Sequence, residues 1–248
     1  MAGHSHWHNI KHHKAIADRK RAAITAKMGV LITVAVQVGG GPNPNDNPRL
    51  RLAMAKARSA EMSNEAIDRA IKKAAGQGPD GRQMAELAYE GYAPGGVAVV
   101  VEALTDNRNR TAPEIKKLFE RCGGSLGAPG CVAWQFKPRA VFLVQGSDAD
   151  RTLEALLAAG ADALDIQAEE GGASIVAESK DYDPILKALA AARITVARSD
   201  LTRLPETEVA VTDPALSRQL QALLEALDDH PDVQDVVHNA AFAESATA

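Results

Sequence analysis

The chain has 248 residues, of which 46% are hydrophobic, and its formal net charge is −4. That length allows two or three domains with a sizeable buried core. The sequence shows no apolar segment of a secretory signal and no window near the roughly twenty apolar residues that cross a bilayer, and Cys122 and Cys131 lack metal-finger spacing. We therefore expect a cytoplasmic protein with reduced thiols, no membrane association and no cofactor.

Charge is distributed unevenly along the sequence. Residues 1–75 carry thirteen Lys and Arg against five Asp and Glu, whereas residues 140–248 carry seven against twenty. A basic front favours an anionic partner, while an acidic rear repels the same polymer and limits how the protein can lie on it. The two ends are therefore expected to have different roles.

The most one-sided segment is 1–21. It contains five cations, five of the seven histidines and one of the two tryptophans, against the single acid Asp18. Cations neutralise phosphates and release counterions, and an indole can stack on a base, so this composition suits nucleic acid. The alternative is a flexible, soluble tail without a partner. The candidate nucleic-acid contacts are His4, Trp7, Lys11, His12, Lys14, Arg19, Lys20 and Arg21.

Apolar residues repeat every three or four positions over residues 15–38, which predicts one long helix. Its last part, LITVAVQV, is rich in β-branched residues and leaves a strand as the alternative. Asn47 predicts the cap of a second helix over residues 48–60, and Ser63 predicts the cap of a third that ends at Gly76. We expect these helices to form a small bundle.

Basic side chains continue along the three helices. Their outer faces are expected to carry Lys27, Arg49, Arg51, Lys56, Arg58, Arg69, Lys72 and Lys73. Of these, Lys27 and Arg49 are predicted to contact nucleic acid, so the basic surface extends beyond the tail. The first two helices do not form a short helix-turn-helix, because about ten residues separate them instead of the usual three or four. This spacing argues against sequence-specific reading of DNA, and a long basic tail with scattered cations suits a folded RNA surface better.

Strands are predicted within residues 87–104, and a polar segment, TDNRNRT, follows them. Thr111 and Glu114 fit a capping box, which places the start of a helix at Thr111. Arg108 and Arg110 would then lie beside exposed N–H groups at the positive end of the helix dipole, an arrangement that binds phosphate. In the alternative, the two arginines pair with nearby carboxylates.

The predicted elements of residues 140–204 follow the order βαββαβ, a split βαβ layout. Once this segment is removed, the elements on its two sides form a second βαββαβ series, which includes CVAWQF and TEVAV as strands. The expected fold class is α+β: an N-terminal three-helix bundle followed by two ferredoxin-like domains, one inserted in the other. The expected ranges are 1–79 for the basic helical domain, 80–138 plus 205–240 for the second domain, and 139–204 for the inserted domain.

The sequence contains one match to the consensus pattern of an enzyme motif. Residues 123–127 read GGSLG and match the GxSxG nucleophile elbow, which requires a strand before the serine and a helix after it. Here a predicted helix precedes Ser125, and a loop with Pro129 follows. The glycines also lack the Lys-Ser/Thr of a phosphate loop, and no paired Cys/His set suggests zinc. We expect no enzyme, no catalytic residue and no metal site.

Six segments carry a family resemblance: AGHSHWHNIKHHK, NPRLRLAMAKA, IDRAIKKAAG, YEGYAPGGVA, LTDNRNRT and CGGSLGAPGCVAWQF. They are similar, in this order, to segments of the YebC/PmpR family of bacterial regulators, whose relatives include the mitochondrial translational activator of cytochrome c oxidase. The resemblance implies a cytoplasmic, non-enzymatic, three-domain protein associated with nucleic acid. It implies either a DNA-binding transcriptional regulator or a ribosome-associated translation factor. The sequence departs from the family at His6 and His13, where Lys and Arg are common, which lowers the fixed charge of the tail.

These observations together predict a non-enzymatic, nucleic-acid-binding regulator of gene expression that is a monomer. Its partner is expected to be ribosomal RNA or DNA, and the preferred role is that of a ribosome- or RNA-associated translation factor. One alternative is a DNA-binding transcriptional regulator. Another is a protein-interaction module whose acidic C-terminal half docks a basic partner.

Overall fold

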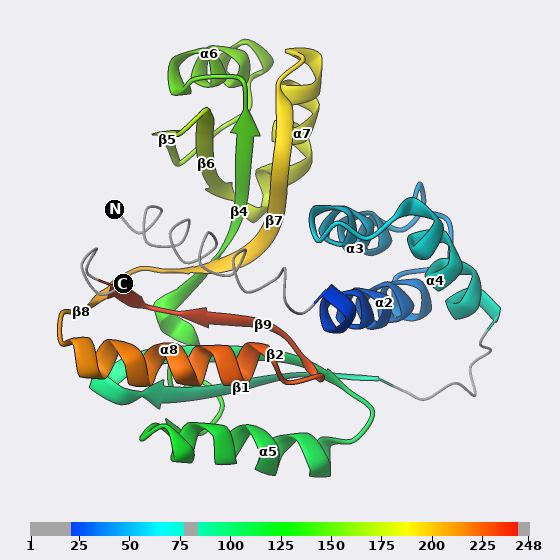
Figure 1. The fold of residues 1–248 in the computed structure, drawn as a ribbon. Helices are drawn as coiled ribbons and strands as arrows, with labels where there is room; N and C mark the ends of the chain where they lie inside the picture. The colour runs from blue at the N-terminus through cyan, green and yellow to red at the C-terminus, as the bar shows by residue number, and fades with distance from the viewer. Residues whose placement is uncertain (1–20, 77–83, 243–248) are drawn as a thin grey trace.

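The structure is a computed structural model that describes residues 21–76 and 84–242. Figure 1 shows a group of helices, a sheet with helices α5 and α8 on one face, and a second sheet that projects away from the first. The helical part consists of α2 (Arg21–Val38), α3 (Pro48–Ser59) and α4 (Asn64–Gly76). The chain therefore combines helices with antiparallel sheets, and the predicted α+β class is confirmed.

The three N-terminal helices pack around one apolar cluster. Ile32 of α2, Leu50 of α3 and Ile67 of α4 are all fully buried in it. The segment LITVAVQV is helical rather than extended, because a helix places Ile32, Ala35 and Val36 together in this cluster. Tertiary packing thus decides a segment whose strand propensity left two possibilities.

Both predicted helix caps in this part are confirmed. The side chain of Asn47 accepts the N–H of Leu50 at 2.9 Å, and the hydroxyl of Ser63 accepts the N–H of Ala66 at 3.2 Å. Asn47 is also fully buried, and its amide group donates to the carbonyl of Ala35 at 2.8 Å. The cap of α3 therefore also ties α3 to the end of α2.

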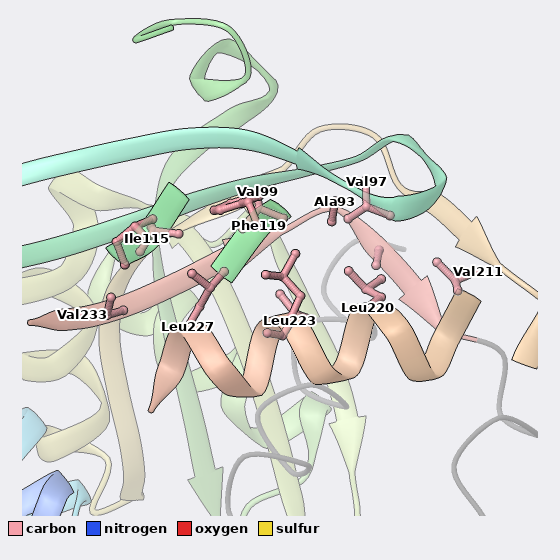
Figure 2. Close-up of a cluster of buried hydrophobic side chains, with 13 residues drawn as sticks. Ala93, Val97, Val99, Ile115, Phe119, Val211, Leu220, Leu223, Leu227 and Val233 are labelled. Carbon is pink, nitrogen blue, oxygen red and sulfur yellow. The ribbon is translucent and has the colours of Figure 1, made fainter. Parts of the chain in front are cut away.

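The second part is an antiparallel sheet in the order β3-β1-β2-β9. Its elements are β1 (Ala85–Ala93), β2 (Val97–Thr105), α5 (Arg108–Arg121), β3 (Ser125–Leu126), α8 (Pro214–Asp228) and β9 (Val233–His238). Figure 2 shows Phe119 of α5 and Leu223 of α8 packed with Val99 on one face of β2. On the other face, Val100 packs with Phe136. Strand β2 is therefore covered on both faces, which accounts for the unbroken apolar run of residues 97–101.

The third part is an antiparallel sheet in the order β5-β6-β4-β7. Its elements are β4 (Phe136–Gln145), α6 (Ala149–Ala159), β5 (Asp165–Glu169), β6 (Gly172–Glu178), α7 (Tyr182–Ala191) and β7 (Thr195–Pro205). Phe142, Ile175 and Leu189 lie fully buried in the apolar cluster between this sheet and its helices. The element order is the βαββαβ series predicted for residues 140–204.

The second part departs from the predicted βαββαβ sheet. Most of CVAWQF forms a loop and a short 3₁₀ helix, Ala133–Gln135, before β4 begins. TEVAV contributes only β8 (Val209–Val211), which pairs in parallel with β10 (Ala240–Phe242) in a separate two-stranded sheet. The place beside β2 is taken by β1, because the two strands follow each other in sequence and close a local hairpin.

Strands β4 and β7 leave the second part side by side and continue into the third (Figure 1). Their pairing begins with Phe136 opposite Pro205 and extends to Gln145 opposite Thr195. The core of the second part contains residues that precede the third part in sequence and residues that follow it, since α5 comes before β4 and α8 comes after β7. We therefore retain, as a proposal, the division into 80–138 plus 205–240 with 139–204 inserted.

Candidate nucleic-acid interface

Helix α4 presents a basic face to solvent. Ile67 and Ala74 bury its opposite side, whereas Arg69, Lys72 and Lys73 are exposed, together with the two acids Glu65 and Asp68. Within residues 21–76 and 84–242, these three cations have no ion pair or hydrogen bond to another side chain. Lys73 also lies in the last turn, where the helix dipole favours a positive charge. This face is therefore available to phosphates.

Helices α3 and α4 are joined by a short turn. Residues 60–63 connect them, and Glu61 adopts a left-handed φ of 59° there. Arg58 braces the turn by donating from Nε to Oδ1 of Asn64 at 3.2 Å. A turn of this length is typical of a helix-turn-helix. The sequence-based argument against that motif compared only α2 with α3, which are separated by residues 39–47, and it overlooked the second pair.

Three basic side chains of the helical part form ion pairs with the other two parts. The pairs are Lys27–Asp228, Arg49–Glu86 and Lys56–Asp200. The expectation of outer-face positions is wrong for Lys27 and Lys56, whose side chains are only 11% and 25% exposed. Carboxylates of α8 and β7 attract these cations inward, so part of the acidic C-terminal half neutralises the basic front within the molecule. For Lys27 and Arg49, contact with nucleic acid stays a prediction.

The Lys56–Asp200 pair is the most enclosed of the three, with 2.8 Å between Nζ and Oδ1. Burial opposes the charge on Lys56, but the carboxylates of Asp200, Asp235 and Glu102 more than offset it, so the pKa of Lys56 lies above its ordinary value. Burial raises the pKa of Asp200, and Lys56 offsets this only in part because Asp235 repels the same carboxylate. One lysine thus balances several acids at the junction between α3 and β7.

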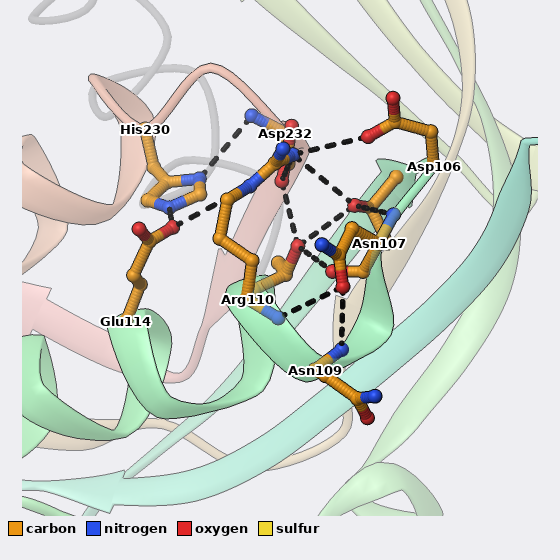
Figure 3. Close-up of polar contacts among 9 residues, drawn as sticks. Asp106, Asn107, Asn109, Arg110, Glu114, His230 and Asp232 are labelled. Atoms are coloured by element: carbon orange, nitrogen blue, oxygen red, sulfur yellow. Dashed lines mark hydrogen bonds and ion pairs between the residues drawn. The ribbon is translucent and has the colours of Figure 1, made fainter.

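A second candidate anion site is the start of α5, shown in Figure 3. The helix begins at Arg108, and the side chain of Asn107 accepts the N–H groups of Asn109 and Arg110 at 3.1 and 3.2 Å. The predicted start at Thr111 is therefore wrong by one turn: Asn107, among the most favoured cap residues, supplies the cap instead. Two of the N–H groups expected to hold phosphate are already satisfied by this cap.

Arg110 is held by carboxylates, as the alternative interpretation of this segment expected. Its guanidinium lies 2.7 Å from Asp232 and 3.3 Å from Asp106 (Figure 3). The buried hydroxyl of Thr111 also donates to Asp232, at 2.6 Å. Burial would raise the pKa of Asp232, but the hydrogen bonds from Arg110 and Thr111 outweigh it and hold the pKa below its usual range. Arg108, by contrast, is exposed and forms no ion pair among the described residues.

His230 completes this cluster. Its Nδ1 accepts the backbone N–H of Asp232 at 3.2 Å, so in the neutral ring Nε2 carries the proton and donates to Glu114 at 3.0 Å. Ligand atoms of Glu114, His230 and Asp232 lie within 4.8 Å of one another, a spacing that could hold a metal ion. Both ring nitrogens are already engaged, however, and Arg110 supplies a positive charge. The cluster therefore joins α5 to the connection between α8 and β9 through hydrogen bonds and ion pairs of its own.

We expect Arg108→Ala and Arg110→Ala to have different effects. Loss of Arg110 should lower the thermal midpoint and raise the pKa of Asp232 toward its ordinary value, because the carboxylate loses its main partner. Loss of Arg108 should leave stability within about 0.5 kcal/mol of the wild type. Thermal unfolding and an NMR titration of the Asp232 carboxyl group check this. Equal destabilisation by both changes would contradict it.

Sequence reasoning missed an exposed aromatic pair beside the glycine-rich segment. Trp134 and Tyr92 are 68% and 38% exposed, and both donate to the carbonyl of Cys131. Trp134 does not lie within a cluster of Lys and Arg residues, so the distribution of charge along the sequence did not indicate it as a candidate contact. In the same segment Ser125 lies on β3 after α5, so it does not occupy the strand-to-helix turn of a nucleophile elbow.

Most of the predicted tail contacts lie outside the described residues. These are His4, Trp7, Lys11, His12, Lys14, Arg19 and Lys20. Arg21 is the first residue of α2. The other predicted contacts lie in two places. Lys27 and Arg49 belong to the helical part, whereas Arg108 and Arg110 lie at the start of α5 and are not on the α4 face.

Comparison with known proteins gives matches over nearly the whole chain. A model described as the TACO1/YebC protein N-terminal domain matches residues 5–77, and one described as the TACO1/YebC second and third domain matches residues 84–240. A probable transcriptional regulatory protein of Moorella thermoacetica is 42% identical over 243 residues, covering 97% of this chain and 95% of the relative. One of Aeromonas hydrophila is 41% identical over 248 residues, covering 100% and 99%.

A solved structure is also similar. The crystal structure of a conserved hypothetical protein from Aquifex aeolicus superposes with a TM-score of 0.80 at 38% identity, covering 92% of this chain and 93% of that one. Among the described helices, none is long and apolar enough to cross a membrane.

Proposed function

Because the chain belongs to the TACO1/YebC family, we propose that it is a non-enzymatic, cytoplasmic, monomeric regulator of gene expression that binds nucleic acid. The observation that carries this proposal is the exposed basic face of α4, where Arg69, Lys72 and Lys73 have no carboxylate partner among the described residues. Elsewhere in the helical part, cations such as Lys56 are already neutralised inside the molecule. The relatives named probable transcriptional regulatory proteins support a regulatory role.

We propose RNA, and ribosomal RNA in particular, as the physiological ligand. A basic segment at residues 1–21 that leads directly into α2, together with scattered cations on α4, suits an irregular, folded phosphate surface. The proposed contacts are His4, Trp7, Lys11, His12, Lys14, Arg19, Lys20, Arg21, Lys27, Arg49, Arg108 and Arg110. To these we add the three exposed cations of α4. Of the proposed contacts, Lys27, Arg49 and Arg110 would have to exchange a carboxylate partner for a phosphate.

A DNA-binding transcriptional regulator is the second candidate. The four-residue connection between α3 and α4 favours it, because a helix-turn-helix places its second helix in the major groove. The first turn of α4, however, contains Glu65, and its cations come later in the helix. The end that usually reads base edges is therefore acidic in this chain.

The interaction-module alternative has less support. Asp228, Glu86 and Asp200 of the more acidic parts already bind cations of the helical part. These three carboxylates are consequently not available to a basic protein partner unless the helical part moves away.

The proposal predicts the effect of removing two sets of cations. Changing Lys11, Lys14, Lys20 and Arg21 together to Ala, or Arg69, Lys72 and Lys73 together to Ala, should weaken binding to nucleic acid. Each lost phosphate contact should reduce the salt slope by about 0.7 to 0.9, so the triple change should reduce it by roughly 2 to 3. Affinity measured at several salt concentrations for ribosomal subunits and for duplex DNA checks this and separates the RNA role from the DNA role.

A matched control removes three exposed cations of the third part, Arg151, Lys180 and Lys187, none of which forms an ion pair within the described chain. This variant has the same change in net charge but leaves the proposed surface intact. Equal losses in the control and in the α4 variant would show that affinity follows net charge and not the α4 face. Unchanged affinity and slope in both test variants would overturn the proposal.

A further inference from the structure

Two exposed aromatic rings lie beside the loop that precedes β4: Trp134 belongs to the short 3₁₀ helix at the end of that loop, and Tyr92 belongs to β1. The indole N–H of Trp134 and the hydroxyl of Tyr92 both donate to the carbonyl oxygen of Cys131, at 3.2 and 3.4 Å. An indole has a single donor, and here it is used within the loop. Trp134 is nevertheless 68% exposed, so most of its apolar ring stays accessible to a partner while its N–H is engaged.

The backbone that carries Trp134 is fixed by one buried carboxylate. Glu90 is 7% exposed and accepts the N–H groups of Gly130, Val132 and Ala133 at 2.7, 2.9 and 2.8 Å. Val132 is itself fully buried in the cluster beneath the loop. The ring positions are therefore set before a partner arrives, which reduces the entropy lost on binding.

The glycines of the segment allow this close packing. A Cβ on Gly127 would lie 2.5 Å from Sγ of Cys131, and one on Gly124 would lie 2.7 Å from the carbonyl oxygen of Tyr92. A side chain at Gly124 would push the loop away from β1, and one at Gly127 would displace the side chain of Cys131. The sequence GGSLGAPG thus allows Cys131 to lie close to β1, where its carbonyl accepts from Trp134 of the loop and from Tyr92 of the strand.

Three kinds of partner can be compared by how they would contact these rings: an unpaired base, a base pair in a duplex and a proline-rich peptide. Every base has a π-face that stacks on an aromatic ring, whereas a base pair inside a duplex presents only its edges in the grooves. A proline-rich peptide also docks on aromatic rings, but its backbone carbonyls need hydrogen-bond donors. The donors of Trp134 and Tyr92 are spent on Cys131, so an unpaired base fits this surface better than such a peptide does.

We infer that Trp134 and Tyr92 form a stacking platform for an unpaired nucleobase, which gives the nucleic-acid partner single-stranded or looped segments. This inference rests on the proposed function. It adds a base-stacking surface on the second part of the fold to the phosphate-binding surface of the helical part.

Tryptophan fluorescence tests the inference, because the chain has only two tryptophans and a Trp7→Phe background leaves Trp134 as the reporter. Labelled single-stranded RNA, single-stranded DNA, duplex DNA and a proline-rich peptide are titrated separately, with anisotropy as the measure of binding. Both single strands should quench Trp134, and the duplex should not. Trp134→Ala should reduce affinity for single strands about ten-fold, Trp134→Phe should reduce it less, and Tyr92→Ala should also weaken it.

Leu157→Ala is the matched control, since Leu157 is also 68% exposed but lies on α6 of the third part. It should leave affinity unchanged. If strands bind the Trp134→Ala variant as tightly as the wild type, the platform is wrong while the proposed function stands. If neither strand nor duplex binds, both fail. Quenching by the peptide alone would replace the nucleobase with a peptide ligand.

Discussion

Replacing Glu90 with alanine is expected to lower the free energy of unfolding by about 3 kcal/mol, the largest loss for a single polar side chain of the second part. The change leaves the buried N–H of Val132 and the part-buried N–H groups of Gly130 and Ala133 without their charged acceptor, and a hydrogen bond to a charged group contributes about 1.5–3 kcal/mol when it is buried and less when water can replace it. Denaturant unfolding measures the loss. Glu120→Ala is the control, because its side chain is 59% exposed and its pair with Lys116 lies on the surface.

Lowering the pH should weaken the same interaction, because it protonates the carboxylate of Glu90. Burial raises the pKa of Glu90, but the three N–H groups more than offset this and hold it below its usual value. A carboxyl group whose pKa is lower in the folded state contributes stability above its unfolded pKa of about 4.3, and that contribution is lost as the pH falls through the folded pKa. The wild type and Glu90→Gln should therefore converge in stability at acidic pH. A constant difference from pH 7 down to pH 3 would show that the charge on Glu90 is not what holds the loop.

Much of the fold could be predicted because its signals are local. Asn47 and Ser63 cap helices by bonding N–H groups three residues away, so sequence spacing suffices to find them. The βαββαβ order of residues 140–204 follows likewise from periodicity. The neighbours of β2 were assigned wrongly, because the expected βαββαβ layout places TEVAV in this sheet, whereas in the structure β1 pairs with β2 and TEVAV pairs with β10.

The site was less predictable because its decisive contacts join distant residues. Lys27 and Lys56 look like surface cations until α8 and β7 bring Asp228 and Asp200 beside them. Thr111 with Glu114 has the spacing of a capping box, yet the hydroxyl of Thr111 bonds Asp232, 121 positions away. Composition correctly locates an excess of cations, but it cannot tell which of them are neutralised within the fold.

Changing Lys56 to Met is expected to lower the free energy of unfolding by about 3 kcal/mol at neutral pH, because it leaves the carboxylate of Asp200 enclosed without its cation. The loss should be smaller in Lys27→Met, since Asp228 is 42% exposed and water can solvate it. Denaturant unfolding at pH 7 compares the two variants. Equal losses would mean that the methylene stem, and not the enclosed charge, determines the cost.

The pH dependence of the Lys56→Met variant distinguishes the electrostatic cause more sharply. Burial already raises the pKa of Asp200, and removal of Lys56 should raise it further. A carboxyl group with a raised folded pKa destabilises the fold progressively as the pH rises through that pKa, and it costs little below the unfolded value of about 3.9. The deficit of Lys56→Met should therefore be large at pH 7 and small near pH 4, and the double variant Lys56→Met with Asp200→Asn should remove most of it at both pH values. A deficit that persists near pH 4, or that the second substitution does not reduce, would show that the junction between α3 and β7 depends on packing and not on this ion pair.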